Sequence, residues 1–325
     1  MTGLKDLVVQ TIRENDSFLL ASHISPDGDA LGSMTGFGWI LRHLGKDFVI
    51  YSPDSIPGHY AWLNTPVPLQ SELPNLEDRW TVVLDCGDRD RMGRALVDML
   101  IPDRTVVIDH HQNNPGFGSV NWIDPVRSSV GEMVAEIALE LGVPLRGELA
   151  LSLYLAIVTD TGYFTFGNTG PRTLEIVGTM LKNGLKPGEV NPVIQNQWSM
   201  NRLHLQGQVL KDAQLHYKGT VGLVTVPSEL LHRTGTSPED CDGLVNFLNR
   251  IRGVRIAAML RENGAGTIKF SLRSSGDTDV QRIARMFDGG GHKNAAGGTI
   301  KGTLDEARKQ LLEAIGRAPE IQDRN

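Results

Sequence analysis

Short runs of consecutive apolar residues alternate with longer amphipathic stretches through the first half of the chain. The runs SFLLAS (17–22), DFVIY (47–51), WTVVLD (80–85) and RTVVID (104–109) are typical of strands buried on both faces. Helical patterns cover about 30–45, 128–142, 147–159 and 171–183, and Gly45, Gly142 and Gly184 end three of them. Strands that alternate with helices predict a parallel sheet with helices on both faces.

The second half predicts a smaller α/β domain with a mixed sheet. Strand patterns occur at 214–227, 254–263 and 266–275, and helical patterns at about 238–250, 279–287 and 303–316. The segment between the halves begins with Pro and Gly and continues as a helical pattern. The expected division is a first domain at 1–187, a helical connector at 188–213, a second domain at 214–319 and a tail at 320–325.

Length and composition describe an ordinary globular chain. Its 325 residues suit about two domains, and 40% hydrophobic with 22% charged residues is neither disordered nor fibrous. No apolar run approaches the about 20 residues that a membrane helix needs, and the charged N-terminus lacks a signal-peptide core. The two cysteines, Cys86 and Cys241, form no CxxC pair. We therefore expect a cytoplasmic protein without a membrane partner.

The charge is distributed unevenly between the halves. The net charge of −6 is made of −9 over residues 1–208 (15 basic, 24 acidic) and +3 over 209–325 (17 basic, 14 acidic). This division is consistent with bound cations in the first half and an anionic substrate that contacts both halves. Random variation of the surface explains the same division equally well.

Acidic and histidine residues cluster where elements of a parallel sheet would end. These residues are His23, Asp27 and Asp29 of HISPDGD, Asp85 after WTVVL, Asp109, His110 and His111 after RTVVI, and Asp160 after an apolar helix. The crevice of such a sheet lies beyond the carboxyl ends of its strands. Carboxylates that share a crevice raise each other's pKa, and divalent cations remove that conflict. Oxygen and imidazole ligands suit Mn²⁺, with Mg²⁺, Fe²⁺, Co²⁺ or Zn²⁺ as alternatives.

Each of these residues also has a purely structural explanation. An Asp after a strand is often a turn former or a helix N-cap, and Asp29 before ALGS fits that role. A single pair of histidines is more often a surface feature than a ligand set. Four clusters at element ends together predict a dinuclear metal site for the hydrolysis of a phosphate ester.

Five segments of the chain resemble the motifs of one known family. In order, HISPDGDALGS, VVLDCGD, VIDHH and AIVTDTGYFTF resemble the four motifs of the DHH phosphoesterase superfamily, and GGGHKNAAGG (289–298) resembles the signature of the DHHA1 domain. The resemblance covers about 17–316. The short length resembles the branch of bifunctional oligoribonucleases (nanoRNases) and pAp phosphatases. It implies hydrolysis of short oligoribonucleotides to mononucleotides, and of 3′-phosphoadenosine 5′-phosphate (pAp) to AMP.

The resemblance also implies a role for each clustered residue. One metal would be held by His23 and Asp27, the other by Asp29, His110 and Asp160, with Asp85 bridging both. Asp109 would orient an imidazole and His111 would face the phosphate, which makes Asp85, Asp109 and His111 the expected catalytic residues. The expected cofactor is a pair of Mn²⁺ ions, with Mg²⁺ or Co²⁺ as alternatives, and a water activated between them as the nucleophile.

The substrate is expected to contact the second domain. Consecutive glycines can bring main-chain N–H groups close to an anion, which predicts contacts from Gly290, Gly291, His292 and Lys293. The fork of donors on Arg273 suits a terminal phosphate, and the resemblance adds Ser129. A flexible loop and a solvated strand residue are the alternatives. Asp288 stands where many family members have glycine, and its carboxylate would weaken phosphate binding unless it points away.

The expected substrates are short. Aromatic residues make up only 6% of the chain and no RNP-like motif is present, which disfavours an extended stacking platform and long duplex nucleic acid. A phosphodiesterase of cyclic or linear dinucleotides (c-di-AMP or pApA) is an alternative with the same chemistry. A non-catalytic nucleotide-binding protein is an alternative from another class, but every ligand position is filled. The sequence leaves the oligomeric state open, with a homodimer as one option.

Overall fold

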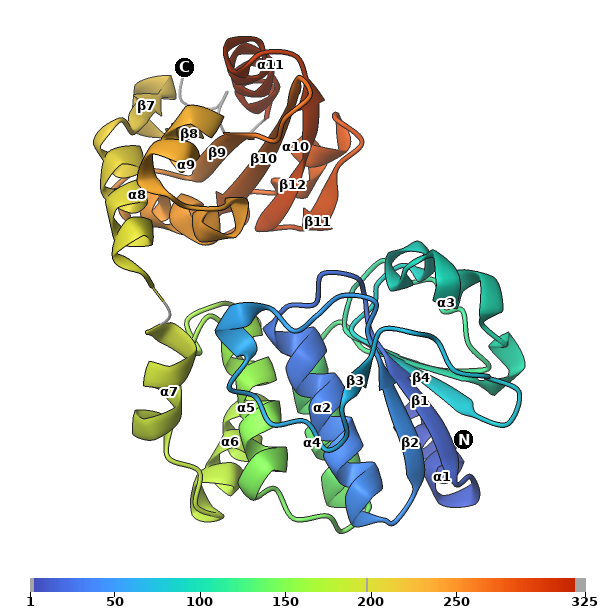
Figure 1. Cartoon of the computed structure of the whole chain (residues 1–325). Helices are drawn as coiled ribbons and strands as arrows, with labels where there is room; N and C mark the ends of the chain where they lie inside the picture. The colour runs from blue at the N-terminus through green and yellow to red at the C-terminus, as the bar shows by residue number, and fades with distance from the viewer. Residues whose placement is uncertain (1–2, 197, 319–325) are drawn as a thin grey trace. The chain divides into compact units, whose positions relative to one another are not determined.

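The computed structural model describes residues 3–196 and 198–318, which form two compact units that divide between positions 197 and 198 (Figure 1). Within the predicted connector, α7 (Pro187–Gln195) belongs to the first unit and α8 (Met200–Lys211) to the second. The predicted tail at 320–325 and residue 319 lie outside the described residues.

The first unit contains a six-stranded parallel sheet in the order β3-β2-β1-β4-β5-β6. The strands are β1 (Ser17–Ala21), β2 (Asp47–Tyr51), β3 (Leu69–Gln70), β4 (Trp80–Leu84), β5 (Thr105–Asp109) and β6 (Val120–Ile123). The four predicted strands are confirmed; β3 and β6 were not predicted because neither is a long apolar run. The chain runs from β1 to β2 and β3 on one side and then crosses to β4 on the other side of β1. This switch point is where parallel sheets place their binding crevice.

Helices cover both faces of this sheet, as predicted. On one face lie α1 (Leu4–Glu14), α2 (Gly28–His43), α4 (Val130–Glu140) and α5 (Gly147–Asp160), followed by α6 (Pro171–Lys182). The other face packs on α3 (Arg94–Met99). Alternate residues of β1 show the two sides, since Phe18 and Leu20 enter the first core while Leu19 and Ala21 enter the second.

A stripe of glycines allows α2 and α5 to pack unusually closely. Gly28, Gly32 and Gly36 recur every four residues, so they share one face of α2. A Cβ atom on Gly28 would lie 2.5 Å from Thr159 Oγ1, and one on Gly32 would collide with the carbonyl oxygen of Ser152. This contact matters for the site because the N-terminus of α2 and the C-terminus of α5 each carry carboxylates.

The second unit is the predicted mixed α/β domain. Its sheet has the order β11-β12-β10-β9-β8-β7, in which β8 and β9 are parallel and the other pairs antiparallel. The strands are β7 (Gln214–His216), β8 (Val221–Val226), β9 (Ile256–Glu262), β10 (Thr267–Ser274), β11 (Gly290–His292) and β12 (Ala295–Lys301); the helices after α8 are α9 (Ser228–Thr234), α10 (Gln281–Arg285) and α11 (Leu304–Gly316). Within 3–196 and 198–318, no helix is both long and apolar enough to cross a bilayer.

Two predictions for the second unit were wrong in detail. The strand expected at 214–227 is two strands separated by a turn at Tyr217–Gly219. The helix expected at 238–250 is two 3₁₀ segments, Pro238–Cys241 and Leu244–Arg250, because Gly243 between them has a φ of +82°. The glycine-rich loop is the hairpin of β11 and β12, in which Gly290 pairs with Gly297. A Cβ atom on Gly291 would overlap the carbonyl oxygen of Ala295, so close strand approach accounts for that glycine.

Candidate metal centre

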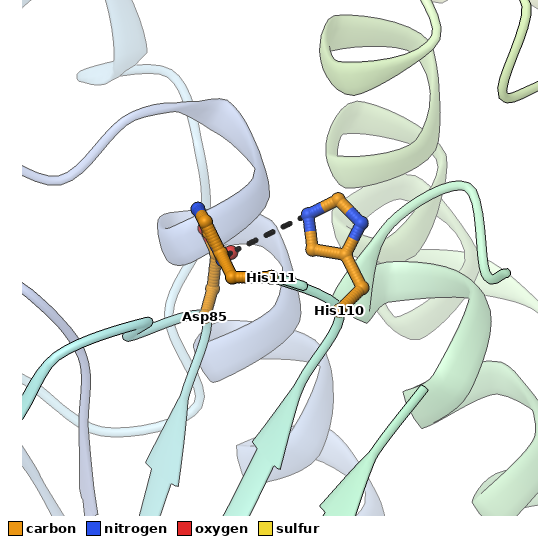
Figure 2. A group of neighbouring side chains, drawn as sticks. All are labelled: Asp85, His110 and His111. Atoms are coloured by element: carbon orange, nitrogen blue, oxygen red, sulfur yellow. Dashed lines mark ion pairs between the residues drawn. The ribbon is translucent and has the colours of Figure 1, made fainter. Parts of the chain in front are cut away.

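The carboxyl ends of three adjacent strands bring the predicted ligands together. His23 follows β1, Asp85 follows β4, and His110 and His111 follow β5, so residues up to 88 positions apart meet at one edge of the sheet. Figure 2 shows Asp85 beside the two imidazoles. Asp85 Oδ1 lies 3.8 Å from His110 Nε2 and 3.6 Å from His111 Nδ1.

Helix termini supply the remaining carboxylates. Asp27 is the N-cap of α2, where its Oδ1 accepts hydrogen bonds from the main-chain N–H groups of Asp29 and Ala30 at 3.1 Å. The prediction that Asp29 could cap this helix is therefore wrong; Asp29 lies in its first turn, buried. Asp160 is the last residue of α5, and its Oδ2 lies 3.5 Å from His110 Nε2.

The six predicted ligands fall into groups of the size that a metal ion requires. His23, Asp27 and Asp85 form one group, Asp29, His110 and Asp160 form another, and Asp85, His110 and His111 form a third. Within each group the ligand atoms all lie within 4.8 Å of one another. The first two groups match the two ligand sets that the family resemblance implied, and Asp85 occurs in two of the three groups.

Burial and mutual repulsion perturb the ionisation of these groups. Burial, reinforced by neighbouring carboxylates, raises the pKa of Asp29 and Asp85 well above the ordinary value. Burial also raises the pKa of Asp160, to about 6. Burial lowers the pKa of His23 and so favours the neutral imidazole. A divalent cation would relieve this repulsion among the carboxylates, and it needs a neutral imidazole as its ligand.

Two main-chain carbonyls set the orientation of the ligand histidines. His23 Nδ1 donates to the carbonyl oxygen of Ile24 at 2.8 Å, and His110 Nδ1 donates to that of Arg127 at 3.2 Å. A carbonyl can only accept, so in each neutral ring the lone pair lies on Nε2. In both residues Nε2 is the atom that lies within 4 Å of the site carboxylates. This is the arrangement of a metal-bound histidine oriented by a partner on its other nitrogen.

The protein also holds the carboxylates Asp29 and Asp85 in place within the site. Asp29 Oδ2 and Oδ1 accept hydrogen bonds from the main-chain N–H groups of Val130 and Gly131, at 2.7 and 2.9 Å, at the N-terminus of α4. Asp85 has a φ of +54°, a left-handed conformation that costs a non-glycine residue about 1–2 kcal/mol. Its buried Oδ1 accepts no hydrogen bond from the described residues. A buried carboxylate oxygen without a donor fits a metal ligand, so the residues present suit a divalent cation.

Asp109 accepts hydrogen bonds from both histidines that follow it. Its Oδ1 accepts from His111 Nδ1 at 2.7 Å and from the main-chain N–H of His110 at 2.9 Å. Burial alone would raise the pKa of Asp109, but the hydrogen bonds from His111 and Asn114 outweigh it and lower the pKa. The sequence analysis missed Asn114, whose Nδ2 lies 2.6 Å from Asp109 Oδ2. The Asn-Pro-Gly sequence after HHQN signalled only a turn.

The polar side chains around 127–131 form hydrogen bonds and ion pairs with other residues of the first unit. Ser129, predicted to contact substrate, is buried and caps α4, accepting a hydrogen bond from the main-chain N–H of Glu132 at 3.1 Å. Arg127 pairs with Asp124, Glu132 and Glu136. A substrate contact from Ser129 stays a prediction.

The predicted contacts of the second unit lie on β10 and the β11–β12 hairpin. Arg273 is on β10, where burial lowers its pKa and nearby Asp242 opposes that effect. Lys293 forms an exposed ion pair with Asp277 at 3.0 Å. Gly290 has open space where a side chain would begin. Asp288 is exposed and has a φ of +53°, a conformation that favours the glycine common at this position in the family.

Fold and site together define a two-domain α/β protein with a carboxylate–imidazole metal centre. The DHH family, N-terminal domain, matches residues 17–157, and the DHHA1 domain matches 220–318. A relative from Thermus thermophilus, named bifunctional oligoribonuclease and PAP phosphatase NrnA, is 33% identical over 91% of this chain and 88% of its own. A protein of the same name from Bacillus subtilis is 29% identical over 95% of this chain and 97% of its own.

A solved structure shares the whole architecture. An exopolyphosphatase-related protein from Bacteroides fragilis superimposes with a TM-score of 0.87 and 27% identity, covering 98% of this chain and 97% of that one. The chain belongs to the DHH family, with a DHHA1 domain after the DHH domain.

Proposed function

We propose that this protein is a metal-dependent phosphoesterase that hydrolyses short oligoribonucleotides to mononucleotides and pAp to AMP. The observation that carries the proposal is the convergence of His23, Asp27 and Asp85 with Asp29, His110 and Asp160 in adjacent groups. The names of the relatives from Thermus thermophilus and Bacillus subtilis support these two substrates.

Two divalent cations, Mn²⁺ by preference and Mg²⁺ or Co²⁺ as alternatives, would be held by these six residues, with Asp85 shared between them. When bound, such ions lower the pKa of a coordinated water and offset charge on a phosphoryl group. The protein contributes ligands that are oriented in advance. The carbonyls of Ile24 and Arg127 fix the two imidazoles, and the N-terminus of α4 fixes Asp29.

His111 is assigned to the substrate phosphate. Asp109 holds His111 through Nδ1, and we assign the Nε2 side of the ring to the contact with a phosphoryl oxygen. The Asp109 carboxylate can only accept from Nδ1, so it fixes the orientation of the His111 ring. Charge that develops on the phosphoryl oxygens during hydrolysis would be stabilised by such a fixed donor.

The second unit is assigned to phosphate binding. Arg273 and the hairpin residues Gly290, Gly291, His292 and Lys293 offer donors for a phosphate, and Ser129 is a further candidate from the first unit. We assign residues 1–187 to the metal-binding domain, 188–213 to the connector and 214–319 to the substrate-binding domain. A cytoplasmic location is proposed with this function, supported by two free, buried thiols. A homodimer stays a prediction.

A substrate panel tests the proposal. Purified protein with Mn²⁺ is given pAp, RNAs of two to five nucleotides, a 24-nucleotide RNA, c-di-AMP, pApA and pyrophosphate. We expect pAp and the short RNAs to be the best substrates. Asp85→Asn should lose at least 10³-fold in kcat, on the order of what removing an essential group costs. The matched control Asp103→Asn, at an exposed position, should be unaffected.

Three outcomes would contradict the proposal. Preference for c-di-AMP or pApA would favour the dinucleotide phosphodiesterase, and preference for pyrophosphate would move the protein to another substrate class. Absence of turnover, together with tight nucleotide binding, would favour the non-catalytic alternative.

A further inference from the structure

One short segment contacts two members of the Asp29–His110–Asp160 group directly and is linked to the third through Asn168. The carbonyl oxygen of Arg127 accepts from His110 Nδ1, and the N–H groups of Val130 and Gly131 donate to Asp29. Asn168 links the segment to the third ligand, because its Nδ2 donates to the carbonyl oxygens of Ser128 at 2.8 Å and Asp160 at 3.1 Å. We call residues 127–131 the ligand-holding segment.

A network of buried charges anchors this segment. The Arg127 guanidinium lies 2.9 Å from Asp124, 3.3 Å from Glu132 and 2.7 Å from Glu136. Glu132 and Glu136 are only 2% and 7% exposed, and carboxylates so buried require partners. Because Arg127 spans three carboxylates with one planar group, its main chain, including the carbonyl that holds His110, is fixed from three directions.

Further bonds leave Glu132 little freedom. Its Oε2 accepts from Ser128 Oγ at 2.7 Å and from Thr173 Oγ1 at 2.6 Å. Arg172 contacts Glu136 Oε1 at 2.9 Å but makes no recorded contact with a site ligand within the described ranges. The network therefore ties α4 and α6 to the ligand-holding segment.

The other ligand group is held independently. His23 is oriented by the carbonyl of its neighbour Ile24, and Asp27 is bonded to the first turn of its own helix. None of the hydrogen bonds recorded for residues 3–196 joins either side chain to the ligand-holding segment. Asp85 belongs to the His23–Asp27–Asp85 group and lies 3.8 Å from His110 of the other group, but the hydrogen bonds that hold the two groups are separate.

We propose that Arg127 and Asn168 are positioning residues that set the metal affinity of the Asp29–His110–Asp160 group without setting that of the His23–Asp27–Asp85 group. The inference rests on the metal centre of the proposed function and not on its substrates. Loss of a group that orients a metal ligand typically costs 10–100-fold in affinity.

The direction of the effect separates positioning from simple electrostatics. Arg127→Gln removes a positive charge from the neighbourhood of a cation site. By Coulomb's law alone, that change would strengthen cation binding. Positioning predicts the opposite, since the carbonyl that orients His110 would lose its anchor. Arg172→Gln is the matched control, because it makes the same charge change in the same network without the main-chain link to His110.

The experiment titrates metal-stripped protein with Mn²⁺ by isothermal calorimetry, so no turnover is needed. The Asp27→Asn variant weakens the His23–Asp27–Asp85 group, so the Mn²⁺ affinity that remains is that of the Asp29–His110–Asp160 group. The Asp29→Asn variant weakens the Asp29–His110–Asp160 group, so the Mn²⁺ affinity that remains is that of the His23–Asp27–Asp85 group. In the Asp27→Asn background we expect Arg127→Gln to weaken Mn²⁺ binding 10- to 100-fold, and Arg172→Gln to change it less than threefold. In the Asp29→Asn background, Arg127→Gln should change the remaining affinity less than threefold.

The proposal would be overturned if Arg127→Gln weakened Mn²⁺ binding equally in both backgrounds. It would also be overturned if Arg127→Gln left Mn²⁺ binding unchanged or made it tighter in the Asp27→Asn background. If Arg127→Gln fails to give a cooperative thermal transition, Asn168→Ala decides instead, because Asn168 is exposed and neutral. That variant should weaken only the Asp29–His110–Asp160 group, by about tenfold. If the protein turns over neither pAp nor short RNAs, but the variants change Mn²⁺ affinity as expected, only the proposed substrates are contradicted.

Discussion

His111 Nδ1 lies 2.7 Å from Oδ1 of Asp109, a carboxylate that is fully buried two residues earlier in the chain. The same carboxylate receives the main-chain N–H of His110 and the Nδ2 group of Asn114. A buried anion with this many donors stays ionised and holds the ring in a single orientation. This pair connects the strand β5 to the chemistry proposed for the site.

Asp109→Asn should therefore impair catalysis more than folding. The amide offers one acceptor where the carboxylate offers two, so it cannot serve His111, the His110 main chain and Asn114 together. We expect kcat with pAp to fall about 10- to 100-fold, with a small change in KM. Steady-state kinetics would check this, with Asn114→Ala as a milder variant that removes one donor and leaves the His111 bond. A kcat within twofold of wild type for Asp109→Asn would contradict the assigned role.

Metal removal should make stability fall as pH rises. Asp160 has a pKa raised by burial to about 6 in the folded protein, against 3.8 ordinarily, so the folded state binds more protons than the unfolded state between these values. The contribution of Asp160 to the free energy of unfolding therefore decreases from about pH 4 to above pH 6. Asp29 and Asp85, whose pKa values are also raised by burial, extend the decrease to higher pH.

The size of this effect is modest. The raised pKa of Asp160, discounted because its side chain is 31% exposed, corresponds to about 1–2 kcal/mol of stability. Urea unfolding of EDTA-treated protein at pH 5 and pH 7.5 would measure it, and saturating Mn²⁺ should abolish the decrease. Asp160→Asn should stabilise the metal-free protein at pH 7.5. Stability that rises with pH in EDTA would show that the carboxylates are not mutually destabilised.

The contact of α2 with α5 should tolerate no added methyl group. Gly32→Ala would place a Cβ atom against the carbonyl oxygen of Ser152 and 2.8 Å from Ala156 N, so the helices must separate. We expect a loss of about 1–3 kcal/mol in the free energy of unfolding. Because the two helices carry Asp29 and Asp160, Mn²⁺ affinity should also fall.

Gly178→Ala on α6 is the control, since a Cβ atom there meets nothing within 4 Å. It should raise stability by about 0.4–1 kcal/mol, because alanine is the better helix former. Denaturant unfolding of both variants would make the comparison. Equal stability for the two would mean that close helix packing is not required.

Arg273 should affect substrate binding rather than the metal centre. Arg273→Gln is expected to raise KM for pAp about tenfold or more, on the scale of one charge-assisted hydrogen bond. Mn²⁺ affinity should not change. Arg285→Gln, at an exposed position on α10, is the control of equal charge. A fall in kcat with no change in KM would contradict a phosphate contact from Arg273.

The sequence alone indicated the four central strands of the first sheet and the candidate residues of the site. Uninterrupted runs such as WTVVLD indicate strands buried on both faces, and parallel strands place Asp85, Asp109 and His23 at one edge whatever the details of packing. The motif order added the pairing of ligands into two sets. The strand predictions were confirmed because they depend on local periodicity, whereas the ligand roles stay predictions.

Tertiary structure alone decided how the ligands are held. Nothing local to Asp29 indicates that the N–H groups of Val130 and Gly131 donate to its carboxylate, because that contact spans more than 100 residues. The role of Asn114 and the carbonyl of Arg127 were equally invisible, since main-chain acceptors carry no sequence signal. The glycine-rich segment forms a hairpin, because its residues in β11 pair with those that begin β12. Composition and period select the elements, whereas only packing determines which donor faces which acceptor.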